Sequence, residues 1–202
     1  MFILTEMKDI IRIEPDRFKF KMEKEVIHQL NSKYANKVVY GVGLCIILFD
    51  VTLVGDPYII AGTGAAHTRV HFRFIVFRPF IGEVLVGKIR SSSSDGLRVS
   101  LGFFDDIKIP ASSLQNPSRF DGREQLWVWE YKNEDEEVHD MFMDTDEEIR
   151  FCVTDETFVD TVPNSDQPPS MVGGAIPDKK QIPYTITGTI ADYGLGLTSW
   201  WS

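Results

Sequence analysis

The sequence predicts an α+β unit in residues 1–80, followed by an all-β barrel in residues 81–202. Two observations lead to this division. Before residue 80, one stretch carries apolar residues at helical spacing between strand-like runs. From Gly82 onward, short strand-like runs alternate with turn-forming residues, which is typical of a small barrel.

The first unit is predicted to run strand, helix, strand, loop, strand. Residues 1–13 read as the opening strand, and Pro15 then suits the first position of a helix. The helix is indicated by apolar residues at every fourth position, namely Phe18, Met22, Val26, Leu30 and Tyr34. The β-rich runs that follow are 38–40, 44–49 and 70–77, and a turn-rich loop over 55–64 separates the last two.

Five short runs are predicted to build the barrel: 84–89, 97–101, 104–109, 126–131 and 149–153. Trp127 and Trp129 lie two residues apart in the fourth run, so they share a face and are expected to fill the barrel. Residues 163–183 contain five prolines and predict a disordered insertion. Residues 184–190 and 195–201 return to strand composition and are expected to pack back on the barrel.

Charge is distributed unevenly along the 202 residues. The formal net charge is −9, and residues 121–160 alone hold 15 acidic and 3 basic side chains. Such a balance argues against a protein coated in nucleic acid. The acidic loop 134–137 is expected to be a solubilising hairpin loop, with a docking site for a basic partner as the alternative reading.

The cysteines and the apolar runs indicate the compartment. Cys45 and Cys152 are far apart and form no Cys-x-x-Cys pair, which excludes a disulfide scaffold and fits a reducing environment. Charged residues follow Met1 too soon for a signal peptide. The longest apolar run, Val42 to Phe49, is far shorter than a membrane span. We therefore expect an intracellular, soluble protein without a membrane partner.

No catalytic, metal or cofactor site is predicted. His67 and His71 lie beside a strand, where four residues span roughly 13 Å, too far for one metal ion to bridge. Asp105 and Asp106 are adjacent and would face opposite sides of a strand, so they cannot share a proton as a catalytic dyad does.

Binding chemistry is better represented than catalysis. Small barrels bind single-stranded nucleic acid through aromatic stacking and basic side chains. The candidate RNA-binding residues are Lys88, Arg90, Arg98, Phe103, Phe104 and Lys108. At least one of the two phenylalanines is expected to belong to the core instead.

Residues 76–84, Val-Phe-Arg-Pro-Phe-Ile-Gly-Glu-Val, resemble the hinge between the two domains of the stalk subunits of archaeal and eukaryotic RNA polymerases. The segments 82–89 and 96–101 look like an S1-type OB-fold barrel. The resemblance covers essentially the whole chain and is greatest to the RNA polymerase III branch of that family. The strings that carry this closer likeness are 36–40, 66–73, 100–106, 127–131 and 194–201.

The resemblance implies a non-catalytic nuclear protein that supports initiation on small non-coding RNA genes. In that family the N-terminal domain, called the tip, docks on the polymerase core, here the RNA polymerase III core, and a small helical subunit completes the stalk. The OB barrel lies close to the exit of nascent single-stranded RNA. By position, core docking falls on Pro57, Gly62, Thr63 and Gly64, and partner binding on Val76, Arg78 and Phe80.

One departure from the S1 pattern bears on RNA binding. S1-type barrels usually carry an aromatic residue and a histidine where this chain has Leu97 and the run 108–110. Strong RNA binding by the isolated chain is therefore not expected, and contact with RNA would depend on assembly, where the effective concentration is high.

Two hypotheses of different classes remain open. The first is a stalk subunit of RNA polymerase III, and the second is a free-standing OB-fold protein that binds single-stranded RNA in translation or RNA decay. A free-standing binder should hold RNA alone with steep salt dependence. A third class, an enzyme with a barrel appendage, lacks a catalytic constellation.

Overall fold

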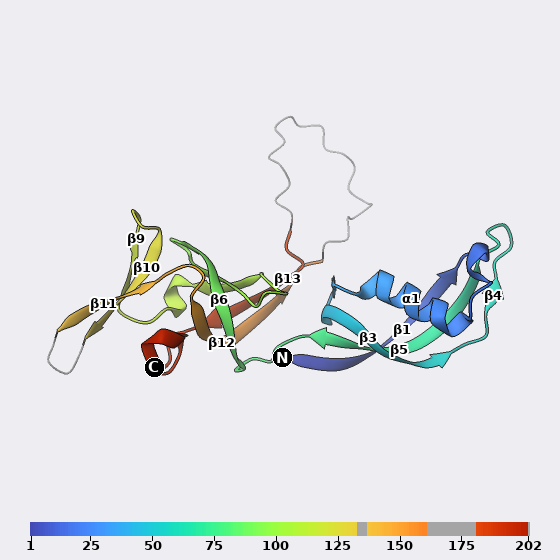
Figure 1. The fold of residues 1–202 in the computed structure, drawn as a ribbon, viewed down its shortest axis with the longest axis horizontal. Coiled ribbons are helices and arrows are strands. Elements are labelled where there is room, and N and C mark those ends of the chain that lie inside the picture. The colour runs from blue at the N-terminus through green and yellow to red at the C-terminus, as the bar shows by residue number, and fades with distance from the viewer. Residues whose placement is uncertain (133–136, 161–180, 202) are drawn as a thin grey trace, which may run out of the picture. The chain divides into compact units, whose positions relative to one another are not determined.

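The computed structural model describes residues 1–132, 137–160 and 181–201. The chain forms two compact units, Met1–Pro79 and Phe80–Ser202 (Figure 1). Most of the predicted insertion, 163–180, lies outside the described residues, as do residues 134–136 of the acidic loop. Within the described residues, no helix is long and apolar enough to cross a membrane.

The first unit is built on a twisted antiparallel sheet. Its strands lie in the order β1 (Phe2–Ile13), β5 (Ala66–Phe77), β3 (Gly43–Val54) and β2 (Lys37–Val39), and the short β4 (Tyr58–Ile59) also pairs with β5. The predicted order of strand, helix, strand, loop and strand is thus confirmed. Three β-bulges interrupt the pairing of β3 with β5, each inserting a residue that bends the strand.

The helix α1 (Met22–Tyr34) begins later than predicted. Pro15–Arg17 forms a separate 3₁₀ turn, in which the N–H of Phe18 donates to the carbonyl of Pro15. Lys21 is extended, so the helix cannot continue back to the turn. Phe18 therefore lies outside the helical stripe, and its side chain is 47% exposed.

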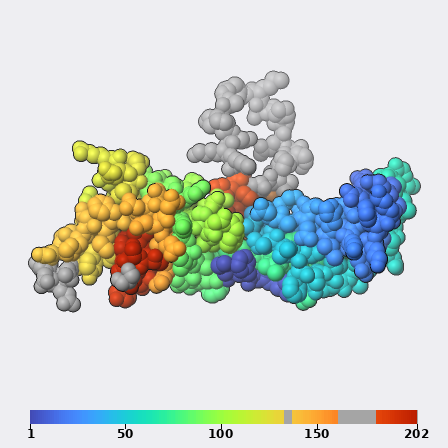
Figure 2. Space-filling model, in the orientation of Figure 1, coloured from blue at the N-terminus to red at the C-terminus, as the bar shows by residue number. Residues whose placement is uncertain are grey.

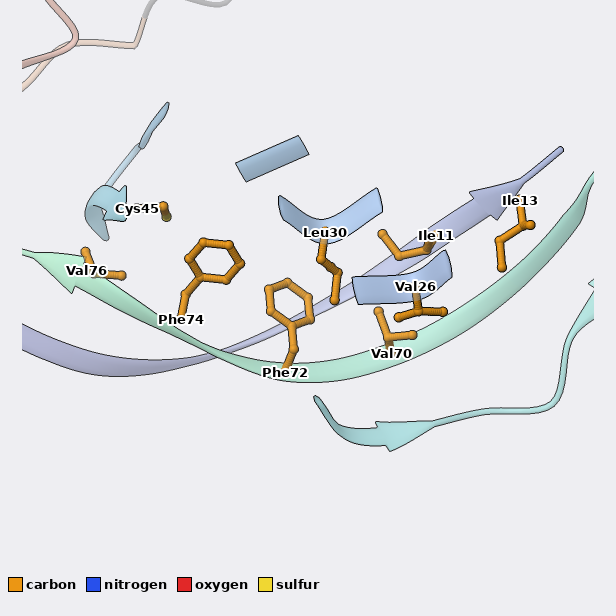
Figure 3. Close-up of a cluster of buried hydrophobic side chains, with 9 residues drawn as sticks. All are labelled: Ile11, Ile13, Val26, Leu30, Cys45, Val70, Phe72, Phe74 and Val76. Atoms are coloured by element: carbon orange, nitrogen blue, oxygen red, sulfur yellow. The ribbon is translucent and has the colours of Figure 1, made fainter. Parts of the chain in front are cut away.

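The apolar face of α1 covers one face of the sheet (Figure 3). On β5 the side chains alternate, so Val70, Phe72, Phe74 and Val76 all point to the helix, and each is fully buried. The same core contains Ile11, Ile13, Val26, Leu30 and Cys45. Burial raises the pKa of the Cys45 thiol to about 11.

The last turn of α1 is tied to β1 by polar contacts. Lys33 Nζ and Tyr34 Oη donate hydrogen bonds to Asp9 Oδ2 at 2.5 and 2.7 Å. Burial is the largest single influence on the pKa of Asp9 and acts to raise it. The bonds from Lys33, Tyr34 and the Ile10 N–H, together with the charge of Lys33, outweigh burial and hold that pKa below its ordinary value. Burial, reinforced by the bond to Asp9, raises the pKa of Tyr34.

The second unit contains a closed five-stranded barrel. Its strands are β6 (Val84–Ser93), β7 (Gly96–Ser100), β8 (Ile107–Pro110), β12 (Glu148–Phe158) and β13 (Tyr184–Thr189). Strand β6 pairs with β7 and β12, β7 with β8, and β13 closes the circle by pairing with both β8 and β12. Only the pairing of β8 with β13 is parallel, and the barrel is consistent with the predicted OB fold.

The interior of the barrel is filled by alternate side chains of all five strands. Those fully buried include Ile89, Val99, Ile107, Ile109, Ile149, Phe151, Tyr184 and Ile186. Gly96 shows why the β6–β7 turn needs glycine: its φ is +136°, and a Cβ there would lie 2.1 Å from the Ile109 carbonyl oxygen. At the far end of β12, the rings of Phe158 and Tyr184 stack with centroids 4.4 Å apart.

The assignment of residues 126–131 to the barrel was wrong. They form β10 (Leu126–Lys132), the centre of a separate sheet between β9 (Ser118–Asp121) and β11 (Val138–Met143). Trp127 and Trp129 therefore do not fill the barrel. Trp127 Nε1 donates to the Ser93 carbonyl at 2.8 Å, and the ring of Trp129 packs on Trp200.

The fifth barrel strand is β13, from the segment that was expected only to pack back on the barrel. The C-terminal residues do pack on the barrel: β14 (Gly196–Leu197) pairs with the start of β12, and Thr198–Trp201 forms a 3₁₀ turn. Alternation of side chains is the same in either sheet, which is why sequence pattern alone could not decide between β10 and β13.

The core of the first unit yields a stability prediction. Phe72→Ala should lower the free energy of unfolding of this unit by about 3–5 kcal/mol, because a fully buried ring is replaced by a cavity. Phe18→Ala, at an exposed ring outside the helix, should change it by less than about 0.5 kcal/mol. Urea unfolding followed by far-ultraviolet circular dichroism measures both. Equal losses would contradict the placement of Phe18.

Candidate nucleic-acid and docking surfaces

A basic pair lies on the outer face of the barrel. Arg98 on β7 and Lys108 on β8 are exposed and stand directly opposite each other in the register of the two strands. Like charges placed opposite each other repel. A bound anion such as a phosphate would therefore reduce the repulsion between the two positive charges. The two basic residues line an open groove of about 730 Å³ together with residues of β12 and β13.

The other two predicted basic residues line a different groove. Lys88 and Arg90 are exposed on β6 and border a space of about 360 Å³. Asp146 and Glu148 border the same space, and Glu148 is the register partner of Lys88. The structure therefore divides the four basic residues between two grooves, and the carboxylates make the β6 groove less favourable for a phosphate backbone.

The two predicted stacking residues are placed differently. Phe103 is 43% exposed, whereas Phe104 is 5% exposed and packs with its centroid 5.5 Å from that of Tyr184. Phe104 is thus a core residue, and of the two rings only that of Phe103 is exposed.

Asp106 lies close to the basic pair. Burial, and next the charge of Asp105, raise its pKa, while Arg98 and Lys108 act in the opposite direction. Asp105 accepts a hydrogen bond from the Ser100 hydroxyl. The predicted strand over 104–109 begins only at Ile107, so neither aspartate is part of the sheet.

The predicted core-docking residues lie on an exposed loop. Pro57, Gly62, Thr63 and Gly64 are all exposed, and Thr63 is fixed by hydrogen bonds from its N–H and its hydroxyl to the carbonyl of Ile60. The two glycines have φ values of +92° and +67°, which favour glycine over other residues.

An apolar groove of about 290 Å³ adjoins this loop and was not predicted. Pro57 forms part of its wall, and the other apolar residues are Ile13, Phe18, Phe20, Met22, Ile59 and Ala66. Phe18 had been assigned to the helix. The sequence signal that could have revealed the groove is the pair Phe18 and Phe20 between charged residues, which fits no single buried face.

The predicted partner-binding residues separate into buried and exposed positions. Val76 is fully buried in the core of the first unit and lines no surface. Arg78 is half-buried, and its Nη1 donates to the Gly41 carbonyl at 2.9 Å. Phe80 is 65% exposed, and its neighbour Ile81 is also exposed.

The open face of the first sheet adds apolar surface that no single predicted residue covered. Phe2, Leu4 and Ile47 are exposed there, and their register partners on β5 are the apolar residues Phe77 and Ile75. Arg73 on this face donates two hydrogen bonds to Asp50, and these lower the pKa of the Asp50 carboxyl. Among the described residues, no group of three or more His, Cys, Asp or Glu side chains could hold a metal ion.

Comparison with known proteins gives matches to both units. The family model described as RNA polymerase III subunit Rpc25 matches residues 83–201. The model described as the SHS2 domain found in the N terminus of Rpb7p/Rpc25p/MJ0397 matches residues 8–64.

Similar proteins span the full length of the chain. DNA-directed RNA polymerase III subunit RPC8 of Bos taurus is 53% identical, covering 100% of this chain and 99% of the relative. The rpc8 subunit of Schizosaccharomyces pombe is 40% identical, covering all of both chains. The archaeal RNA polymerase subunit Rpo7 of Sulfolobus acidocaldarius is 26% identical over 64% of this chain and 71% of its own.

The raised pKa of Asp106 predicts how the second unit responds to acid. A carboxylate whose pKa is higher in the folded chain than in the unfolded chain opposes folding at neutral pH. This penalty disappears as the pH falls through the folded-state pKa. Asp106→Asn should therefore raise the free energy of unfolding at pH 7 and change it little at pH 3. Urea titrations at both pH values test this, and an equal effect at both would contradict it.

Proposed function

Because this chain belongs to the family of RNA polymerase III subunit Rpc25, whose relatives are named subunit RPC8, we propose that it acts as the non-catalytic stalk subunit of that polymerase. The observation that carries the proposal is the 53% identity over essentially the full length of both chains. Of the two hypotheses raised from the sequence, the comparisons support this one. The proposed location is the nucleus, and the proposed role is support of initiation on small non-coding RNA genes.

The first unit is the proposed docking module for the polymerase core. The exposed loop with Pro57, Gly62, Thr63 and Gly64 adjoins an apolar groove, so a core subunit could insert an apolar side chain there while the loop sets its position. Burial of exposed apolar area supplies the driving force for such a contact. Phe18, Phe20 and Ile59 add to the residues proposed from the sequence.

The small helical partner is proposed to bind exposed apolar surface at and near the hinge. Phe80 and Ile81 are the strongest candidates, because large apolar side chains exposed next to each other mark interaction sites. Val76 is buried in the core of the first unit and is therefore not proposed as part of this surface, and Arg78 is bonded to the Gly41 carbonyl.

Contact with exiting RNA is proposed for the groove beside Arg98 and Lys108. In OB folds the second and third strands carry the usual nucleic-acid surface, and here these strands are β7 and β8. Phe103 offers an exposed ring for a base. The acidity of the second unit still argues that this contact depends on assembly.

Affinity purification tests the assignment to the polymerase. A tagged full-length chain, recovered from nuclear extract at moderate salt, should retain the large RNA polymerase III subunits and a small helical subunit in mass spectrometry. Ile59→Asp, which places a charge in the apolar groove, should lose the large subunits and keep the small one. Val138→Asp, at an exposed valine of the second unit, is the matched control and should keep both. Recovery of ribosomal or RNA-decay factors without polymerase would overturn the proposal.

The RNA surface is tested on the purified chain with oligouridine at high protein concentration, from low salt upward, because the isolated chain is expected to bind RNA weakly. Arg98→Ala or Lys108→Ala should weaken binding and reduce the salt slope by about 1 each, because one phosphate contact is lost. Arg90→Ala, in the groove that also holds carboxylates, should have a smaller effect. A larger effect of Arg90→Ala would move the RNA path to the β6 groove.

A further inference from the structure

A third pocket of the second unit is lined mainly by aromatic rings. It lies where β10 and β11 meet the C-terminal residues and has a volume of about 410 Å³. In Figure 2 the red C-terminal surface lies against the orange surface of the same unit. The rings that line the pocket are Trp129, Tyr131, Tyr193, Trp200 and Trp201.

The rings are tilted relative to one another. Trp129 meets Tyr131 at 60° and Trp200 at 42°, with centroids 5.1 and 5.0 Å apart. Tyr193 meets Trp201 at 69° and 4.8 Å. Rings in such an arrangement do not form the parallel pair between which a flat base would stack. A compact cation, by contrast, is attracted to each ring face that it approaches.

Two of the rings are held in place by the chain around them. Trp201 Nε1 donates to the Leu195 carbonyl at 3.0 Å. The ring of Trp200 lies over Gly196, where a Cβ would come within 2.5 Å of it, so only glycine permits this packing. A pocket whose walls are fixed before a ligand arrives loses less entropy on binding.

The polar groups at the pocket also favour a cation. Gln115 is buried, and its amide nitrogen donates to the carbonyls of Asp192 and Leu195, which leaves the amide oxygen as its acceptor. In the sequence, Asp192 lies between the lining residues Ala191 and Tyr193. Glu137 Oε2 lies 3.9 Å from His139 Nε2, and His139 is the register partner of Tyr131. These carboxylates and the strong acidity of residues 121–160 would repel a phosphate backbone and attract a basic segment.

We propose that this aromatic pocket binds the side chain of an arginine or lysine from a basic peptide segment of another protein. The residues that line this site are different from those that line the groove proposed for RNA. It gives the acidity of residues 121–160 a specific role, in which the charge draws the peptide in and the rings hold one cationic side chain.

The test is a titration of the purified full-length chain followed by tryptophan fluorescence. The probes are twelve-residue peptides of alternating Arg-Gly and of alternating Glu-Gly, a polyproline peptide, and oligouridine. We expect a saturable change with the Arg-Gly peptide that weakens as salt is added. Tyr193→Ala should weaken this binding by about fivefold, the value of one exposed cation–π contact.

Two further variants make the result specific. Tyr193→Phe keeps the ring and should bind as the unsubstituted chain does. Phe142→Ala removes an exposed ring from the opposite face of β11 and should also leave binding unchanged. Because Tyr193 is 92% exposed, its replacement should not disturb folding, which circular dichroism verifies.

Four outcomes would overturn the proposal. They are no saturable change with the Arg-Gly peptide, equal binding of the Glu-Gly peptide, tighter binding of polyproline or oligouridine at this pocket, and unaltered binding by Tyr193→Ala. The titration uses the chain alone, so its result does not depend on whether the chain assembles into a polymerase.

Discussion

The pairing of β13 with both β8 and β12 is the constraint on which the second unit depends. It closes the barrel, and closure removes the exposed edges that five short strands would otherwise present. It also places β13 next to β8, so that Thr185 and Thr187 line the groove together with Arg98 and Lys108. The C-terminal residues then pack against β12, which positions the tryptophans of the aromatic pocket.

The first unit depends on a simpler arrangement, a five-stranded sheet, with three long strands (β1, β5 and β3), that carries one helix on one of its faces. The helix covers the buried side chains of β5, and the polar contacts of Asp9 secure its last turn. The opposite face then remains available, with apolar residues exposed beside the Arg73–Asp50 pair. A fold with only one covered face suits a protein that completes its packing by assembling with others.

Much of the fold could be predicted from the sequence. Apolar residues at alternate positions of a strand, or at every fourth position of a helix, indicate which face is buried. The strands of the first unit and four of the barrel strands follow that rule. The exceptions have physical reasons: β10 alternates as a barrel strand does, and Phe18 continues the helical spacing although the chain is extended at Lys21. The basic residues were found from their type, but their division between two grooves depends on register. The aromatic pocket joins residues more than sixty positions apart, so no local pattern could reveal it.

The stacked rings of Phe158 and Tyr184 have a consequence for how this chain can vary. They are register partners, and the Val159 N–H donates to the Pro183 carbonyl. The end of β12 and the start of β13 are therefore held side by side. When the two ends of a loop are held together, doubling the length of the loop costs only about 0.6 kcal/mol of closure entropy. The barrel thus places little restriction on what is inserted there. The connection between β12 and β13 is therefore the position at which evolution, or an engineer adding a reporter domain, can lengthen the chain without changing the barrel.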